Sequence, residues 1–371
     1  MYYSEARTPA SAISSLGAFW RQLNPTENVL TVGVLSYLIL GSLFLLATGS
    51  SPLFLLEALD DAFILGGQIV SVIAPYWMIA LGVVAFVAIS LSNRSLLARL
   101  VPFFVAVVYC TLFVSMFSVV KNSMHVVTPF WADAAFSRLD QMLHFGRDPH
   151  DFFFWLAGYD TSALARFYIN SWVVLATFFP AILIACDPDS KRRMQFIVLW
   201  MAAWVVLGNV VAVFFLSYGP IFSDLFGQGV AEAHSGALAL LDREDAHMLR
   251  EIKVLLWSAY TSGNPRVGTG ISAFPSVHVG MATVIGLYVI RIGYDVARRL
   301  SSKPHLARAL RAVALISAAL YILTYFALSV YLGWHYALDG YASFGIIVGL
   351  YWAMQRRSQD SIPGYGQNCA V

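Results

Sequence analysis

Eight long apolar stretches constrain this chain most, because each is close to the length of a membrane-spanning helix. They lie at about 28–48, 68–91, 99–120, 167–186, 195–216, 275–294, 309–330 and 337–355. About 20 mostly apolar residues cross the hydrocarbon core of a bilayer as a helix. Composition agrees, since 59% of the 371 residues are hydrophobic and only 12% are charged. Soluble domains have about 25% charged residues. We therefore expect an all-α, polytopic membrane helix bundle with about eight transmembrane helices.

The distribution of charge predicts the orientation, because Lys and Arg favour cytoplasmic loops. If the N-terminus is inside and eight spans alternate, 15 of the 23 basic and six of the 21 acidic residues lie inside. Eight basic and 15 acidic residues then lie outside, so the two sides carry +9 and −7. We expect both termini to be cytoplasmic, in a plasma or inner membrane. The first 27 residues show no cleavable signal peptide. The expected partner is the lipid bilayer and not a nucleic acid.

The spans divide the chain into three parts. Residues 1–98 are expected to form an N-terminal tail and two accessory transmembrane helices, 99–355 a catalytic membrane domain, and 356–371 a cytoplasmic tail. Two outer segments are long. Residues 121–166 mix aromatic and charged residues, which suits a helix lying in the membrane interface. Residues 217–274 contain a helical stretch at about 236–260.

The sixth span begins with a polar segment, Gly268-Thr-Gly-Ile-Ser-Ala-Phe-Pro-Ser-Val-His278. Pro275 suits the first turn of a helix, and Ser276 and His278 would follow within that turn. Free backbone N–H groups and the positive end of the helix dipole lie there, which favours a phosphate. An ordinary helix start with an interfacial histidine is the alternative interpretation.

The eighth span begins with Tyr331-Leu-Gly-Trp-His335-Tyr-Ala-Leu-Asp339. His335 and Asp339 are four residues apart and are expected to share one helical face. The carboxylate can accept the imidazole N–H and fix its tautomer, which leaves the other ring nitrogen free to react. The topology places this pair on the same side of the membrane as His278. Ionisable residues near membrane depth are costly and usually functional, so we expect one shared site.

These two motifs together resemble the phosphatidic acid phosphatase type 2 superfamily, which carries Pro-Ser-x-His and His-xxx-Asp elements at outer helix ends. Within it, the motifs look closest to the inositol phosphorylceramide synthase branch. Upstream motifs also resemble that branch: Pro129-Phe-Trp-Ala-Asp133, Leu139-Asp140, His144-Phe-Gly-Arg-Asp-Pro149 and Ser217-Tyr-Gly-Pro220. The resemblance covers about residues 100–355 and implies a six-helix core.

The resemblance implies a lipid phosphotransferase with a phosphohistidine intermediate and no metal or other cofactor. His335 would be the nucleophile, Asp339 would orient it, and His278 would protonate the leaving oxygen. The substrate would be a membrane lipid and the acceptor a lipid or alcohol. Ser276 would help to bind the phosphate. The superfamily's Arg six residues before the nucleophile is replaced by Ser329, so the candidate phosphate-binding cations are Arg266, Lys253 and Lys121.

Other functions stay open. Water as the acceptor would make the chain a lipid phosphatase. Two histidines and an aspartate would also suit a metal-dependent membrane hydrolase. A transporter would show repeats in corresponding halves, and the sequence shows none. Asn209 is expected to bond between helices, Asp133 and Asp140 to be surface or capping groups, and Tyr218, Gly219 and Pro220 to end the fifth span.

Overall fold

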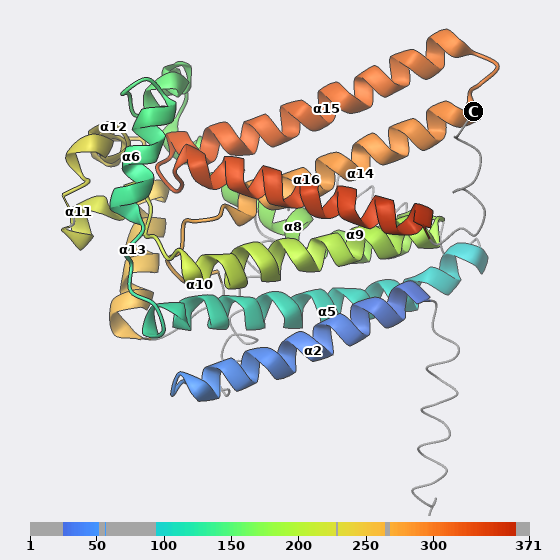
Figure 1. Ribbon diagram of the computed structural model, residues 1–371, viewed down its shortest axis with the longest axis horizontal. Helices are drawn as coiled ribbons and strands as arrows, with labels where there is room; N and C mark the ends of the chain where they lie inside the picture. Colours follow the sequence, from blue (N-terminus) through green and yellow to red (C-terminus); the bar gives the residue numbers. More distant parts are fainter. Residues whose placement is uncertain (1–24, 52–55, 57–93, 228, 264–267, 361–371) are drawn as a thin grey trace, which may run out of the picture.

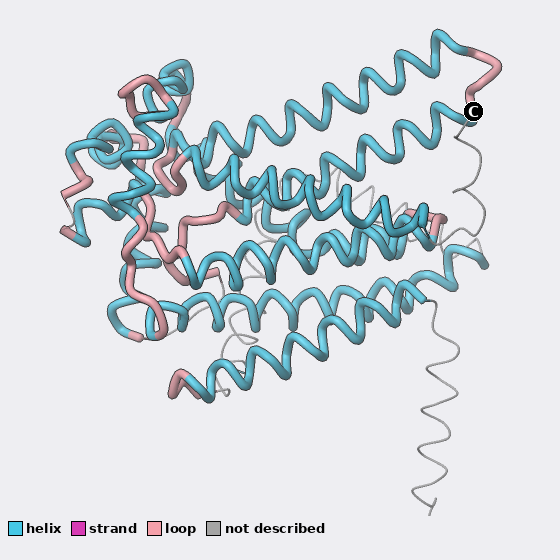
Figure 2. The backbone as a smooth tube through the Cα atoms, in the orientation of Figure 1, coloured by secondary structure: helices cyan, strands magenta, loops and turns pink. Residues whose placement is uncertain are grey.

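The computed structural model describes residues 25–51, 56, 94–227, 229–263 and 268–360. Seven helical segments in these residues are long and apolar enough to cross a membrane, and the described residues contain helices and loops but no strand (Figure 2). This confirms the all-α membrane bundle. The predicted span at 68–91 lies outside the described residues, so seven of the eight expected spans are observed.

The spans match the predicted order, and two of them are built from more than one helical segment. They are formed by α2 (Pro25–Ala47), α5 (Arg94–Ser123), α7 to α8 (Thr161–Arg166 and Trp172–Cys186), α9 to α10 (Ser190–Ala202 and Ala212–Phe214), α14 (Val277–Arg299), α15 (Pro304–Tyr331) and α16 (Ala337–Asp360). A π-helical segment, η3 (Phe167–Ser171), joins α7 to α8. A second one, η4 (Ala203–Val211), joins α9 to α10. Helix α16 continues four residues beyond 356, where the tail was predicted to begin.

Small residues let the helices of the bundle approach closely. A Cβ on Gly293 of α14 would lie 2.4 Å from the Cβ of Ala314 on α15. A Cβ on Gly280 would lie 2.3 Å from Leu207, so α14 is also close to η4. Small residues at such crossings allow the van der Waals packing on which helix association in a bilayer depends. Between α2 and η4, the Tyr37 hydroxyl donates to Asn209 Oδ1 at 2.7 Å, which confirms the predicted interhelical role of Asn209.

One end of the bundle is held by a buried charge network. Arg192 of α9 donates to both carboxylate oxygens of Asp187, at 2.7 and 2.5 Å. The same guanidinium donates to Asp295 of α14 at 2.7 Å. A bidentate, multiply bonded guanidinium satisfies the charges that burial would otherwise penalise. This network ties the α8–α9 turn to the far end of α14.

The other end of the bundle carries a cap made of the two long connecting segments. The first contains η1 (Met124–Val126), α6 (Asp133–Leu143) and the 3-10 segment η2 (Pro149–Gly158). The second contains η5 (Pro220–Phe222), α11 (Ser223–Phe226), η6 (Glu232–His234), α12 (Ser235–Ala239), η7 (Leu240–Asp242) and α13 (His247–Ser262). Helices α6 and α13 run across the spans and not along them (Figure 1). The stretch predicted as one helix at 236–260 is therefore broken into α12, η7 and α13.

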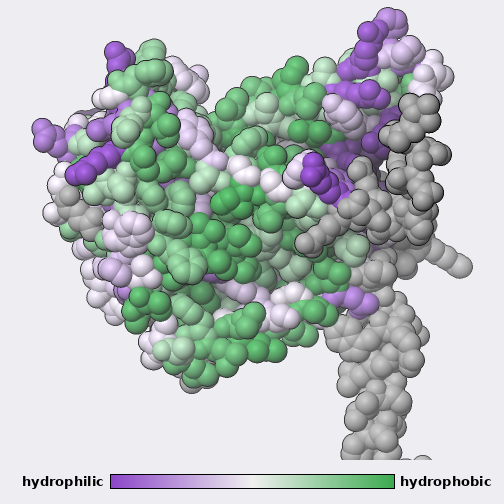
Figure 3. Space-filling model, in the orientation of Figure 1, coloured by the Kyte–Doolittle hydropathy of each residue, from purple (hydrophilic) through white to green (hydrophobic). Residues whose placement is uncertain are grey.

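The distribution of apolar and hydrophilic residues on the surface follows this architecture. Apolar surface covers the middle of the bundle, and hydrophilic residues gather toward its two ends (Figure 3). Lipid-facing side chains need to be apolar because the bilayer core offers no hydrogen bonds.

Candidate active site

Both histidine motifs lie at the cap end of the bundle, as the shared-site prediction requires. The ring centroids of His278 and His335 are 5.9 Å apart. His278 lies in the first turn of α14, and His335 lies in the loop that connects α15 to α16. The connection is direct, because the Ser276 N–H donates to the Asp339 carbonyl at 3.3 Å. Two loops about 60 residues apart in sequence therefore meet at one place.

His335 and Asp339 form the predicted hydrogen-bonded pair. Nδ1 of His335 lies 3.1 Å from Oδ2 of Asp339, and the same oxygen accepts the Tyr336 N–H at 3.0 Å. The pair does not share a helical face, although the spacing predicted one. His335 precedes the helix, and only Asp339 lies in the first turn of α16. The side chain of His335 is 8% exposed and that of Asp339 is 0% exposed. The carboxylate is thus placed to hold the Nδ1–H tautomer, which directs the Nε2 lone pair elsewhere.

The electrostatic surroundings keep the His335 ring neutral. Burial lowers the pKa of His335 from 6.5 to about 3, and the positive charge of Lys121 adds to the lowering. A hydrogen bond with the backbone of Ala273 opposes these two effects. A neutral imidazole keeps the lone pair that a nucleophile needs.

Ser276 begins the α14 helix instead of lying within its first turn. It is the N-cap residue, and its Oγ accepts the Val279 N–H at 3.3 Å. Pro275 therefore precedes the helix, which corrects the prediction that the proline starts it. Ser and Thr favour the N-cap because the side-chain oxygen satisfies a free backbone N–H.

Two aromatic rings hold His278 in place. Tyr168 of η3 stacks on one side at 4.3 Å between centroids and 16° between planes. Trp172 of α8 stacks at 4.0 Å and 27°, and its Nε1–H donates to the His278 carbonyl at 3.3 Å. We call Tyr168 and Trp172 the aromatic clamp. The clamp leaves the ring edge, where both nitrogens lie, as the reactive part of His278.

Helix α6 supplies two buried carboxylates that sequence reasoning undervalued. Asp133 accepts the N–H groups of Tyr218 and Gly219 at 3.0 Å and the Tyr336 hydroxyl at 2.9 Å. Asp140 accepts the N–H groups of Ala337 and Leu338 at 2.7 and 2.9 Å. Asp140 is therefore a capping group, although it caps α16 from another helix. Neither residue is on the surface, since Asp133 is 0% and Asp140 1% exposed.

The Ser217-Tyr-Gly-Pro220 segment lies against both of the loops that carry the histidine motifs. Ser217 accepts the Phe274 N–H through its Oγ at 3.0 Å and the Ala273 N–H through its carbonyl at 2.8 Å. Gly219 has a φ of +85°, and a Cβ there would lie 2.7 Å from the Trp334 carbonyl. Only glycine allows both this conformation and this approach. The segment follows the fifth span, as predicted, and it also supports the site.

The three candidate phosphate-binding cations differ in their surroundings. Lys121, near the end of α5, is close enough to lower the pKa of His335. Its backbone also packs against Gly270, whose added Cβ would lie 3.2 Å from the Lys121 carbonyl carbon. Lys253 instead donates to both carboxylate oxygens of Asp224 at 2.8 Å. Arg266 lies outside the described residues. Ser329, in place of the superfamily's arginine, is buried, and its carbonyl accepts the His335 N–H at 3.2 Å.

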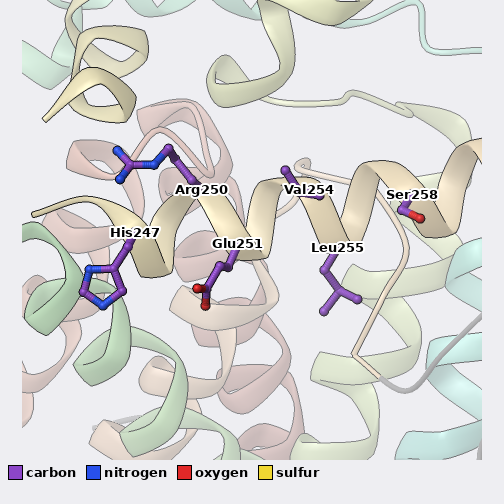
Figure 4. Close-up of a pocket in the computed structure, with 6 residues that line it drawn as sticks. All are labelled: His247, Arg250, Glu251, Val254, Leu255 and Ser258. Carbon is purple, nitrogen blue, oxygen red and sulfur yellow. The ribbon is translucent and has the colours of Figure 1, made fainter. Parts of the chain in front are cut away.

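A separate hollow on the cap surface involves none of these residues. It is lined by His247, Arg250, Glu251, Val254, Leu255 and Ser258 (Figure 4). All six belong to one face of α13 at helical spacing, and His247 Nδ1 lies 3.0 Å from Ser162 Oγ. The hollow is therefore a feature of the α13 surface and not part of the histidine site.

Comparison with known proteins gives one significant match. No curated protein and no solved structure is significantly similar to the chain. The sequence model of the PAP2 superfamily matches residues 134–353, which is more than half of the chain. The matched region includes His278, His335 and Asp339, together with the buried Asp140. By this match the chain is an integral membrane protein that belongs to the PAP2 superfamily.

Proposed function

We propose that the chain is a lipid phosphotransferase with a phosphohistidine intermediate. The observation that carries the proposal is the pairing of His335 Nδ1 with Asp339, with His278 on the neighbouring helix end. Nε2 of His335 would attack the phosphorus atom while the bond to the leaving oxygen breaks. His278 would donate a proton to that oxygen. Members of the PAP2 superfamily are typically phosphatases or phosphotransferases, which agrees with this chemistry.

The second half-reaction returns both histidines to their starting states. The acceptor hydroxyl would lose its proton to the now neutral His278 as its oxygen attacks the phosphorus. The P–N bond to His335 then breaks, and Nε2 regains its lone pair. An alcohol acceptor gives transfer, whereas water gives hydrolysis, so a lipid phosphatase remains the alternative within the same chemistry.

A phosphoinositol transfer like that of inositol phosphorylceramide synthase is the specific reaction that we favour. Its support comes from the upstream motifs that suggested this branch. Asp133, Asp140 and Ser217 all bond to the two loops that carry the histidines. Motifs far apart in sequence that converge on one site are expected to serve one reaction.

We also propose how the substrate phosphate is held and where the site faces. Lys121 is the best-placed cation, because its charge acts directly on His335. The free N–H groups at the start of α14 would add a positive field. The +9 and −7 division of charge supports an extracytoplasmic site with both termini in the cytoplasm. Labelling of Glu244→Cys, in the cap, by an impermeant maleimide in intact cells tests this orientation; the label should react without permeabilisation.

The decisive experiment for the reaction uses purified protein in lipid vesicles. Radiolabelled phosphatidylinositol and lipid phosphates are offered with and without a ceramide or another long-chain alcohol. Transfer predicts a labelled product only when the acceptor is present. Release of inorganic phosphate at the same rate with or without an acceptor would establish the phosphatase alternative. An acid-labile label retained on the wild-type protein but absent from His335→Ala would identify the intermediate.

A further inference from the structure

Helix α6 has one face that builds the candidate site. Its buried residues are Asp133, Phe136, Ser137 and Asp140, which share a face at helical spacing. Through Asp133 and Asp140 this face bonds to Tyr336, Ala337 and Leu338, directly beside His335. The position of α6 therefore helps to set the position of the nucleophile.

The C-terminal end of α6 and the segment after it expose a dense group of large apolar side chains. We call this group the outer apolar patch, and it consists of Met142, Leu143, Phe145, Phe152, Phe154 and Trp155. Phe145 is 93% exposed, and Met142 and Phe154 are each 77% exposed. Single exposed apolar residues are ordinary, but six within 14 residues mark a contact surface.

The patch adjoins the surface of the bundle that faces lipid. Next to Phe145, His144 Nε2 lies 3.0 Å from the Tyr341 hydroxyl of α16, and the two rings stack. Tyr341 and Phe344, one turn further along α16, are 46% and 45% exposed. Helix α6 lies across the ends of the spans (Figure 1), and apolar surface extends from the bundle onto the cap (Figure 3). The lipid-facing surface of α16 therefore leads directly to the patch.

We propose that the outer apolar patch inserts into the interfacial region of the lipid leaflet next to α16. Aromatic side chains concentrate at this depth of a bilayer, with one end apolar and one end hydrated. Arg138 and Arg147 are exposed beside the patch, where cations meet lipid phosphates. Helix α6 then contacts the catalytic loop through its buried face, and its C-terminal end and the segment after it contact the bilayer. It fixes the depth of His335 relative to a membrane-embedded substrate, and this second part rests on the proposed function.

Depth measurements test the membrane contact without any need for enzymatic activity. Nitroxide labels are placed at Phe145→Cys and Phe154→Cys in full-length protein in phospholipid vesicles, with Cys110, Cys186 and Cys369 replaced by alanine. Glu244→Cys, an exposed position elsewhere in the cap, is the control. The patch labels should collide more with oxygen than with a water-soluble nickel chelate, and the control label should show the reverse. Patch labels as open to nickel as the control would overturn the proposal. Labels protected from both reagents would show a protein partner or a second copy of the chain instead.

A kinetic comparison tests the role of the patch in catalysis. The Phe145→Ser/Phe154→Ser variant is assayed with a vesicle-embedded lipid phosphate and with water-soluble para-nitrophenyl phosphate. We expect the KM for the embedded lipid to rise by about tenfold, because interfacial binding scales with the apolar area inserted. The kcat/KM for the soluble ester should stay within about twofold, a margin typical of surface substitutions away from a site. Equal loss with both substrates would contradict the depth-setting role. If the parent protein turns over neither of these substrates nor phosphatidylinositol, with or without an alcohol acceptor, the proposed function fails while the label depths still decide the membrane contact.

Discussion

Asp339 holds His335 through one carboxylate oxygen and leaves its other oxygen without a hydrogen-bond partner among the described residues. The bonded oxygen lies 3.1 Å from Nδ1, so it favours one tautomer of the proposed nucleophile. The carboxylate is held rigidly, because its residue also accepts the Ser276 N–H and the Ser343 hydroxyl through the backbone carbonyl. In the proposed mechanism, a fixed, buried carboxylate of this kind would stabilise positive charge on the imidazole as the phosphoryl group arrives.

The Asp339→Asn variant is therefore expected to separate the effect of the carboxylate charge from that of side-chain shape. The amide keeps the size of the side chain but favours the wrong imidazole tautomer. Loss of the equivalent carboxylate in a Ser-His-Asp triad lowers kcat by about 10⁴-fold, and we expect a loss of 10³- to 10⁴-fold here. The turnover number measures the effect, and the thermal midpoint of the detergent-solubilised protein serves as the folding control. A variant with wild-type turnover would remove Asp339 from the mechanism.

The aromatic clamp is expected to matter most for poor leaving groups. Trp172→Leu frees one face of His278 and removes the Nε1–H bond to its backbone, so proton donation becomes less well aligned. General acid catalysis contributes about 10²- to 10⁴-fold, and loss of alignment should cost about tenfold of this with an alkyl phosphate ester. An aryl ester needs little protonation and should react at nearly the normal rate.

Phe179→Leu is the matched control for the clamp, because Phe179 is a buried aromatic residue of the same helix that packs against Tyr288. Phe179→Leu should slow the alkyl and aryl phosphate esters by the same factor, or should slow neither of them. If Trp172→Leu slows the aryl and alkyl esters by the same factor, the clamp supports the fold and does not position His278.

Sequence reasoning found the parts of the site that lie close together in the chain. His335 and Asp339 are four residues apart, and Pro275, Ser276 and His278 form one short motif. The membrane spans were equally predictable, because an apolar run of about 20 residues has few structures open to it other than a transmembrane helix. Asp133, Asp140, Tyr168 and Trp172 act on partners 80 to 200 residues away, and a single sequence carries no signal for such pairings.

Local structure also explains why the sequence did not predict the contacts of Tyr168 and Asp140. Tyr168 lies in a π-helical segment, where the register of side chains shifts relative to a regular α-helix. Regular helical spacing therefore gives no direct prediction that both Tyr168 and Trp172 stack on His278. Likewise, an aspartate near a helix start normally caps its own helix, whereas Asp140 caps α16.

Lys121→Gln is expected to change both phosphate affinity and pH dependence. Removing the ammonium should raise the KM for an anionic substrate, because a charged hydrogen-bond donor is lost. The charge of Lys121 also lowers the pKa of His335, so its removal raises that pKa. More of the proposed nucleophile is then protonated at a given acidic pH, and the acid limb of the kcat/KM profile should move to higher pH.

Lys253→Gln is the comparison for this effect, because Lys253 is paired with Asp224 in the cap. Its acid limb should coincide with that of the wild type. A shift of equal size in both variants would mean that general charge, and not proximity to His335, controls the profile.

Gly219→Ala is expected to displace the catalytic loop. The glycine has a φ of +85°, and the added Cβ would lie 2.7 Å from the Trp334 carbonyl, next to His335. Gly227 has a similar φ of +65°, but among the described residues nothing lies within 4 Å of an added Cβ. Both alanine variants carry the cost of a positive φ, about 1 to 2 kcal/mol, so thermal stability should fall in each. Only Gly219→Ala should also lose turnover, by about 10²-fold, since catalysis is sensitive to displacements of about 1 Å. Equal turnover in the two variants would show that the contact with Trp334 does not control the position of His335.

Metal independence separates the proposed mechanism from the metal-dependent hydrolase, because each predicts a different use of the same three side chains. In the described part of the chain, no three His, Cys, Asp or Glu side chains gather in a metal-binding arrangement. Asp339 is turned toward Nδ1 of His335, which is the position of a partner that orients a ring and not of a ligand beside it. Two histidines alone are too few for a zinc site with three protein ligands and one open position.

We expect activity to survive exhaustive dialysis against chelators. Vanadate should inhibit, because it resembles the trigonal phosphoryl group that the helix end and Lys121 are proposed to stabilise. The measurements are turnover after chelation and the metal content of the purified protein. One equivalent of zinc, with activity lost on its removal and restored on its return, would replace the phosphohistidine mechanism with the metal-dependent one.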